Sequence, residues 1–334
     1  MTSVPTIQAK AVEKIIRAAA VRGVAARDLY QAAGVIPEGL NDPDHRIPFA
    51  QVVALYEQGA RLTKDDAFGL HVGEAVDPKA FDVLGYSVIN SSTLGEGIDR
   101  AVRYNSIWTN GSYLSIDRAS ALTRIGYVYL DETIVERRHD TEMTFAAFAS
   151  LSRNVTNSEV SPARVRFQHD RPGDTSEHQR IFKCPVEFNA AANEYFVDSI
   201  ALALPIVKAD PSLCAVLDRL AEGLIEKYPR ADTLVERVRT MIKDELSGGN
   251  ASLERVAHDL SMSGRTLQRK LREHGTSHQE LLDQMRRDLA IRYLREPEMA
   301  ICEVAYLLGF SESSALHRAF KRWTGQTPKQ FRGK

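Results

Sequence analysis

The most constraining feature of the sequence is an apolar spacing that occurs twice in its C-terminal part. Four apolar residues at positions i, i+3, i+4 and i+7 form the first copy: Leu253, Val256, Ala257 and Leu260. The same spacing recurs 48 residues later in Ile301, Val304, Ala305 and Leu308. Because this spacing places the four side chains on one face of a helix, each copy predicts a short amphipathic helix.

Each copy is followed by a turn and by the pattern of a second short helix. In the first copy, Ser263 can cap this helix, and Leu267 and Leu271 are expected to point inward. In the second copy, the inward positions are Leu316, Phe320 and Trp323. Between the copies, an apolar pattern from Leu281 to Tyr293 predicts a connecting helix, which Pro297 would end.

This arrangement predicts two helix-turn-helix units, in which the second helix of each unit presents its outer face to a DNA major groove. We expect the polar residues of these outer faces to contact bases: Arg265, Thr266, Gln268, Arg269, Ser313, Ser314, His317 and Arg318. We expect phosphate contacts from the hydroxyl and basic residues beside them: Ser263, Lys270, Arg272, Ser311, Lys321, Arg322 and Arg332.

The second unit carries a family resemblance in the order of its motifs. Gly309-Phe310 precedes the second recognition helix, Phe320-Lys321 lies on it, and Gly325, Thr327-Pro328 and Phe331-Arg332 follow. Residues 250–334 thereby resemble the DNA-binding domain of the AraC/XylS family of bacterial transcription regulators. The resemblance implies an all-α domain that binds double-stranded promoter DNA.

Whole-chain charge gives a misleading first impression. The 334 residues contain 43 Lys and Arg against 44 Asp and Glu, and a net charge of −1 argues at first against nucleic-acid binding. Residues 241–334, however, carry 16 positive and 12 negative side chains, which leaves +4 there and −5 in the remainder. The short stretch Ser247–Asn250 predicts a linker between a domain of residues 1–246 and a domain of residues 251–334.

The N-terminal part predicts a mixed α+β domain rather than a doubly wound sheet. Expected helices are 7–20, 48–62, 65–74, 80–90, 94–108 (with a capping box from Thr93 to Glu96), 134–155, 176–182, 210–227 and 233–246. Expected strands are 122–130 (with Ile125, Tyr127 and Tyr129 on one face), 164–169, 186–188 and 195–197. Segments from Asp44 to Gly95 resemble the arabinose-binding-like N-terminal domain of one AraC-family branch, which implies effector sensing or dimerisation and does not imply arabinose.

Three N-terminal segments allow two interpretations each. Residues 25–34 resemble a helix-turn-helix but are better explained as a structural helix. The apolar stripe of residues 213–224 indicates either a helix buried in its own domain or a dimer helix. The charged cluster of residues 137–142 indicates a solvated helix start, with a polar effector site as the alternative.

The sequence predicts no enzyme, cofactor or metal site, because no zinc, P-loop, dinucleotide or hydrolase motif is present. A rival hypothesis is a DNA-repair alkyl acceptor that uses Cys184, although that cysteine lacks the Pro-Cys-His-Arg motif. No apolar run is long enough to span a membrane, and three distant cysteines favour a cytoplasmic protein. The expected partners are promoter DNA, a small-molecule effector, a second copy of the chain, and RNA polymerase if the protein is an activator.

Overall fold

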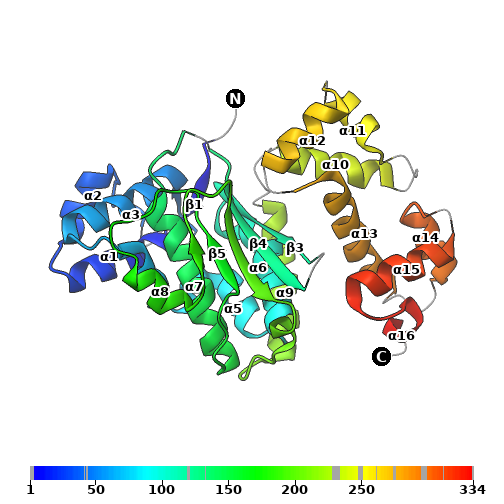
Figure 1. Cartoon of the computed structure of the whole chain (residues 1–334), viewed down its shortest axis with the longest axis horizontal. Coiled ribbons are helices and arrows are strands. Elements are labelled where there is room, and N and C mark those ends of the chain that lie inside the picture. Colours follow the sequence, from blue (N-terminus) through cyan, green and yellow to red (C-terminus); the bar gives the residue numbers. More distant parts are fainter. Residues whose placement is uncertain are drawn as a thin grey trace. The chain divides into compact units, whose positions relative to one another are not determined.

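The computed structural model describes residues 4–40, 42, 44–118, 121–131, 133–227, 234–246, 251–260, 262–273, 276–294, 299–310 and 312–332. The chain divides into two compact units, Met1–Ala231 and Asp232–Lys334, which Figure 1 shows in sequence colours.

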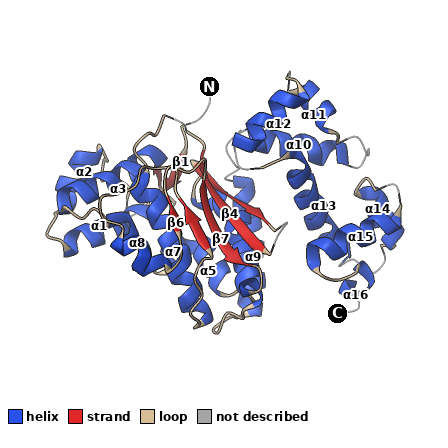
Figure 2. Cartoon of the chain, in the orientation of Figure 1, coloured by secondary structure: helices blue, strands red, loops and turns tan. Residues whose placement is uncertain are grey.

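The N-terminal unit combines helices with a central sheet, as the α+β prediction expected (Figure 2). Its helices are α1 (Ala11–Val21), α2 (Ala26–Ala33), α3 (Phe49–Thr63), α4 (Phe68–Glu74), α5 (Asp82–Ile89), α6 (Leu94–Trp108), α7 (Arg138–Thr156), α8 (Ser176–Phe182) and α9 (Pro211–Lys227). Two short 3-10 helices, η1 (Pro78–Phe81) and η2 (Ala201–Ala203), complete the helical elements of the described residues.

The sheet has five strands in the order β3 (Ser112–Asp117), β4 (Leu122–Tyr129), β7 (Asn193–Asp198), β5 (Arg164–Arg166) and β6 (Val186–Glu187). All neighbours are antiparallel except β5 and β6, which are parallel. On β4, the predicted alternation is confirmed, because Ile125, Tyr127 and Tyr129 are all buried. Because side chains at alternate positions of a strand share one face, these three form a continuous inner surface.

The N-terminal segment differs from the single helix expected over residues 7–20. Thr6–Gln8 form β1, which pairs antiparallel with β2 (Arg46–Pro48) and places Ile7 opposite Ile47. The helix therefore begins only at Ala11. Local sequence favoured the helix throughout, whereas pairing with a strand about forty residues away decided the outcome.

The start of α6 follows the predicted cap closely. The Thr93 hydroxyl accepts a hydrogen bond from the Glu96 backbone N–H at 3.2 Å. The Glu96 carboxylate accepts in return from the Ser92 backbone N–H at 3.3 Å, one residue earlier than an ideal capping box requires. These bonds satisfy donors at the helix start and fix where α6 begins.

In the C-terminal unit, the regular elements of the described residues are all helices (Figure 2). They are α10 (Leu234–Leu246), α11 (Leu253–Asp259), α12 (Gly264–Glu273), α13 (His278–Leu294), α14 (Ile301–Leu307), α15 (Ser313–Thr324) and α16 (Pro328–Arg332). None of the described helices is both long and apolar enough to cross a membrane.

The compact units divide at a different place from the expected domain boundary. Helix α10, which the sequence assigned to the N-terminal domain, packs against α13 and belongs to the C-terminal unit. Buried Val235, Val238 and Ile242 form the apolar side of α10. The expected linker, residues 247–250, lies outside the described residues.

Candidate nucleic-acid interface and internal cavity

The first helix-turn-helix unit consists of α11 and α12, which pack together through the predicted apolar faces. Val256 and Ala257 on α11 are buried, and so are Leu267 and Leu271 on α12. The Ser263 hydroxyl accepts a hydrogen bond from the Thr266 backbone N–H at 3.2 Å and therefore caps α12, as the sequence predicted. The apolar sides face inward, which leaves the polar side of α12 exposed.

The second unit, α14 and α15, has the same design with more aromatic packing. Gly309 adopts a φ of 68°, a left-handed conformation that glycine tolerates, and so permits the tight turn between the helices. The Phe310 ring lies 6.2 Å from that of Trp323, and the Phe320 ring lies 5.5 Å from that of Phe331. These contacts fix α15 between the turn and the last helix.

Arg286 on the connecting helix α13 ties that helix to the second unit, a role that sequence reasoning missed. Its guanidinium donates to the Leu308 carbonyl at 2.9 Å and to the Gly309 carbonyl at 3.1 Å. It also lies 4.5 Å from the centre of the Phe310 ring. Because helix ends leave carbonyls without partners, this arginine stabilises both the turn and the Phe310 ring beside it.

The residues predicted to contact bases all remain accessible within the C-terminal unit. Exposed side chains on α12 and α15 are Arg265, Gln268, Arg269, Ser314 and Arg318, and half-buried ones are Thr266, Ser313 and His317. The Thr266 hydroxyl bonds to that of Ser263 at 2.8 Å, so it is engaged at the helix cap. The polar sides of α12 and α15 therefore lie at the surface of the C-terminal unit.

Arg318 is held near the start of its own helix. Its guanidinium lies 3.6 Å from the Glu312 carboxylate and donates to the Ser314 hydroxyl at 3.4 Å. The Ser314 hydroxyl in turn donates to Glu312. Because the Arg318 side chain is exposed, this ion pair is weak.

The predicted phosphate contacts differ in their surroundings. Lys270, Arg272, Lys321 and Arg322 are exposed, and Arg322 is also paired with Asp283 of α13 at 3.0 Å. Arg332 donates to the carbonyls of Leu294 and Met299, at 3.4 and 2.7 Å, which gives it a structural role after α13. Ser263 is the cap described above, and Ser311 lies outside the described residues.

The charged cluster at the start of α7 is not a solvated helix start. His139, Asp140 and Glu142 are buried, which overturns that interpretation. The Asp140 carboxylate accepts from the hydroxyls of Tyr127 and Tyr129 at 2.8 and 2.6 Å. Because residues two apart on a helix lie on different faces, α7 places Arg138 near the surface while Asp140 lines a cavity of about 140 Å³.

The cysteine chemistry of the alkyl-acceptor hypothesis has little support in this environment. Cys184 is half-buried, and burial raises the pKa of its thiol to about 11. A thiol with this pKa is protonated at neutral pH, whereas alkyl transfer requires a thiolate.

Comparison with known families assigns both units. The model described as the arabinose-binding domain of AraC transcription regulators, N-terminal, matches residues 23–206, and a helix-turn-helix domain model matches residues 256–334. The first match alone covers more than half of the chain. The chain therefore belongs to the AraC family of DNA-binding transcription regulators, which confirms the resemblance found in the sequence.

Individual relatives match either nearly the whole chain or about a third of it. The ornithine utilization regulator of Pseudomonas aeruginosa is 29% identical over 323 residues, which are 96% of this chain and 94% of the relative. The transcriptional activator RhaS of an Enterobacter species is 29% identical over 111 residues, 33% of this chain and 40% of RhaS. The crystal structure of CdpR from Pseudomonas aeruginosa is 23% identical, with a TM-score of 0.44, and the match covers 92% of this chain and 96% of CdpR.

Proposed function

We propose that this regulator is a transcription activator that binds its promoter as a homodimer and responds to a small molecule held in its N-terminal unit. The observation that carries the proposal is the pair of exposed polar recognition helices, α12 and α15, in one helical unit. The proposal contains no catalytic step, because binding and a change in conformation account for regulation.

Recognition helices of this kind read DNA by entering successive major grooves on one face, about 34 Å apart. Arg265, Arg269 and Arg318 suit guanine edges, and Gln268 suits adenine. Lys270, Arg272 and Lys321 supply positive charge beside them. The modest net charge of this region predicts binding that depends more on specific contacts than on bulk attraction.

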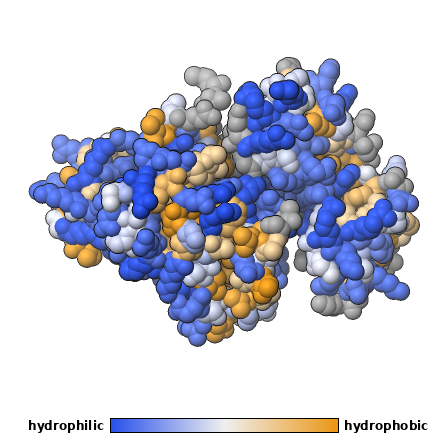
Figure 3. All heavy atoms as spheres, in the orientation of Figure 1, coloured by the Kyte–Doolittle hydropathy of each residue, from blue (hydrophilic) through white to orange (hydrophobic). Residues whose placement is uncertain are grey.

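The outer face of α9 supports the proposal of a homodimer. Leu213, Val216 and Leu220 of this helix are 42%, 51% and 51% exposed. Cys214 and Ala221 are buried on its inner face, so the exposed residues of the stripe lie outside the core of the N-terminal unit. Figure 3 shows hydrophobic surface in the part of the N-terminal unit where Figure 1 places α5 and α9. An apolar helical stripe of this spacing favours helix pairing.

The sign of regulation is proposed from RhaS, whose name describes it as an activator. An activator of this class would contact RNA polymerase as a further partner when bound beside a promoter. The test is transcription from the mapped promoter with purified polymerase and the full chain. Higher transcript yield supports activation, and lower yield contradicts it.

DNA binding itself is tested with the full chain on mapped promoter fragments and on random DNA of equal length. We expect a specificity ratio of about a thousand or more, with a steep dependence on salt. Equal affinity for both DNAs would contradict the proposal.

The homodimer is tested by Leu220→Asp, which places a carboxylate in the apolar stripe. Val21→Asp is the matched control, because Val21 is 82% exposed on α1 and lies outside the stripe. Sedimentation should give a dimer for the parent chain and the control, and a monomer for Leu220→Asp. A dimer that survives Leu220→Asp would exclude α9 as the contact.

A further inference from the structure

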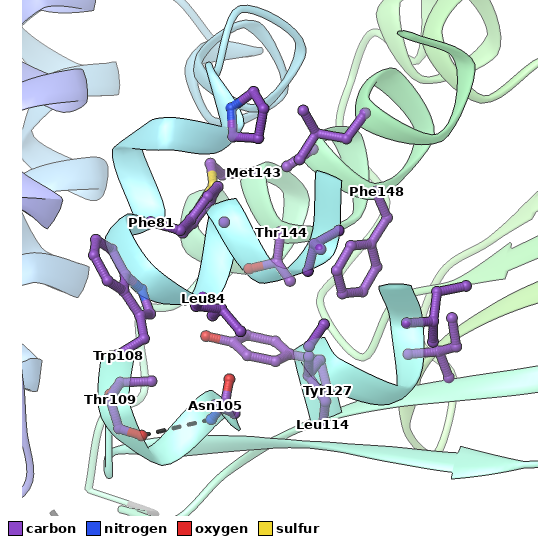
Figure 4. Close-up of a pocket in the computed structure, with 18 of the residues that line it drawn as sticks. Phe81, Leu84, Asn105, Trp108, Thr109, Leu114, Tyr127, Met143, Thr144 and Phe148 are labelled. Atoms are coloured by element: carbon purple, nitrogen blue, oxygen red, sulfur yellow. Dashed lines mark hydrogen bonds between the residues drawn. The ribbon is translucent and has the colours of Figure 1, made fainter. Parts of the chain in front are cut away.

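The cavity in the N-terminal unit has walls that are almost entirely apolar. Helices α1, α3, α5, α6 and α7 and strands β3, β4 and β7 all contribute lining residues. Figure 4 shows the aromatic side chains of Phe81, Trp108, Tyr127 and Phe148 around it, with Leu84, Leu114 and Met143. An apolar cavity of this kind favours the apolar body of a ligand over bulk water.

One cation lies on this apolar wall. Lys14 of α1 lines the cavity, and its ammonium lies 4.6 Å from the centre of the Phe81 ring and 5.0 Å from that of Trp108. Among the described residues, no carboxylate lies within ion-pair distance of this ammonium. Burial lowers the pKa of Lys14 to about 8, although the negative charge of Asp140 opposes the shift. A half-buried ammonium without an acceptor is costly unless something pairs with it.

Asp140, whose negative charge acts on Lys14, already has hydrogen-bond donors of its own. Its Oδ2 accepts hydrogen bonds from both the Tyr127 and Tyr129 hydroxyls. The polar groups that remain on the cavity wall without a hydrogen-bond partner include the hydroxyls of Tyr56 and Tyr195, both buried. The Lys14 ammonium therefore lacks an acceptor in the cavity, and hydroxyl donors are available elsewhere on the cavity wall.

We propose that this cavity is the effector site and that it binds a monocarboxylate with an apolar body, the carboxylate pairing with the Lys14 ammonium. A dry cavity of roughly 150 Å³ holds benzene, so the apolar body should be about the size of one aromatic ring or of a six-carbon chain. The inference rests on the proposed function, since it identifies the class of effector that the regulator senses.

Helix α6 connects the cavity to the exposed stripe of α9. Gly97, Ile98 and Ala101 of α6 line the cavity. On its other side, the Arg100 guanidinium donates to both carboxylate oxygens of Asp218 on α9, at 3.0 and 2.9 Å. The Tyr104 hydroxyl donates to Asp218 as well, at 2.9 Å. A ligand that shifts α6 would therefore move the helix proposed as the dimer contact.

The experiment is calorimetric titration of the full chain with phenylacetate and hexanoate. Neutral 2-phenylethanol and cationic 2-phenylethylamine serve as ligands of similar shape and different charge. We expect both carboxylates to bind more tightly than the alcohol, and the amine to bind least. Tighter binding of the amine, or no binding of either carboxylate at millimolar concentration, would overturn the proposal.

Two variants locate the binding. Lys14→Met keeps an unbranched side chain and should weaken carboxylate binding about tenfold or more while sparing the alcohol. Lys10→Met is the matched control, because Lys10 lies next to the same helix, does not line the cavity and forms only a 3.9 Å surface pair with Asp82. Equal carboxylate affinity in all three proteins would show that Lys14 does not hold the ligand.

Ala101→Phe fills the cavity from α6 and should weaken the carboxylates and the alcohol alike. Unchanged binding of either ligand in this variant would place the ligand elsewhere and overturn the proposal. Promoter binding is measured on the same preparations without ligand. A chain that binds its promoter specifically but no carboxylate disproves the effector class alone, whereas loss of specific DNA binding in the parent chain counts against the proposed function.

Discussion

In the C-terminal unit the side chains predicted to read DNA lie on exposed helix faces, whereas in the N-terminal unit Lys14, Tyr56 and Asp140 border an internal cavity. The first arrangement suits a large polyanion, which can reach only the surface. The second suits a small molecule, which must lose its water to bind. The C-terminal unit thus keeps these charged groups in water, whereas the N-terminal unit partly buries Lys14 and fully buries Asp140.

The free-energy penalty of burying a charge differs between the two units. Arg318 and Lys321 are exposed, so water solvates their charges whether or not a side chain pairs with them. Lys14 is half-buried, and its lowered pKa records the penalty of holding a charge there. Function and stability therefore oppose each other at the cavity and are nearly independent at the recognition helices.

The largest effect should come from the aromatic core of the second helix-turn-helix unit. Phe320→Ala removes a fully buried ring and should cost about 3–5 kcal/mol in the free energy of unfolding of the C-terminal unit. Carboxylate binding by the N-terminal unit should persist. Tyr306→Ala is the control, because Tyr306 is exposed on α14, and denaturant unfolding with a DNA-binding assay measures both. Loss of ligand binding in Phe320→Ala would show that the two units do not fold independently.

Substitutions on the recognition helix α15 should distinguish a base contact from a phosphate contact. Arg318→Ala should cost about 1–3 kcal/mol on the cognate site and relax specificity at one position. Lys321→Ala should weaken binding to all sequences alike and reduce the salt slope by about one. Affinities on cognate and single-base variant sites, measured at several salt concentrations, give both quantities. Identical behaviour of the two variants would contradict this assignment.

The affinity of the cavity for carboxylates should depend on pH. Because the pKa of Lys14 is about 8, carboxylate affinity should fall about tenfold between pH 7 and pH 9 as the ammonium loses its proton. Asp140 is the charged group that acts on Lys14, and burial raises the pKa of Tyr56 and Tyr127 well above the usual range, so neither tyrosine ionises there. The affinity of 2-phenylethanol over the same range is the reference, and a parallel fall for the alcohol would exclude Lys14 as the cause.

A change of similar size is expected in the stability of the ligand-free protein. A lysine whose folded pKa lies below 10.5 destabilises the fold at pH values below about 8, and this penalty fades as pH rises towards 10.5. Lys14→Met should therefore raise the free energy of unfolding by about 1–2 kcal/mol at pH 7 and by less at pH 10, since partial exposure reduces the full linkage value. Denaturant unfolding at both pH values measures the difference. If the variant is less stable than the parent at pH 7, the inference that the Lys14 ammonium is unpaired is wrong.

Several elements could be predicted because their causes are local. The face of β4, the start of α6 and the inward residues of α12 and α15 follow from period-two and period-3.6 spacing and from capping. The strand β1 could not be predicted in this way, because its partner Ile47 lies far along the chain. Strand β3, with Leu114 opposite Tyr127, was also missed, although its partner β4 follows it after a short connection.

The functional residues divide along the same line. The exposed faces of the recognition helices were predictable, since a helix with one apolar side must present its other side to solvent. Lys14 carried no signal, because a single lysine on an amphipathic helix is normally solvated. Arg286 and Arg332 resembled ordinary basic residues until their carbonyl partners were known.

The sequence by itself determined that this chain carries two helix-turn-helix units and an α+β domain, because spacing, caps and family motifs act over a few residues. Only the tertiary structure decided that α10 belongs with the C-terminal unit and that Asp140 and Lys14 share one cavity. Those outcomes depend on which distant surfaces meet. Burial then shifts the pKa values of these side chains. Sequence spacing does not encode which distant surfaces bury them.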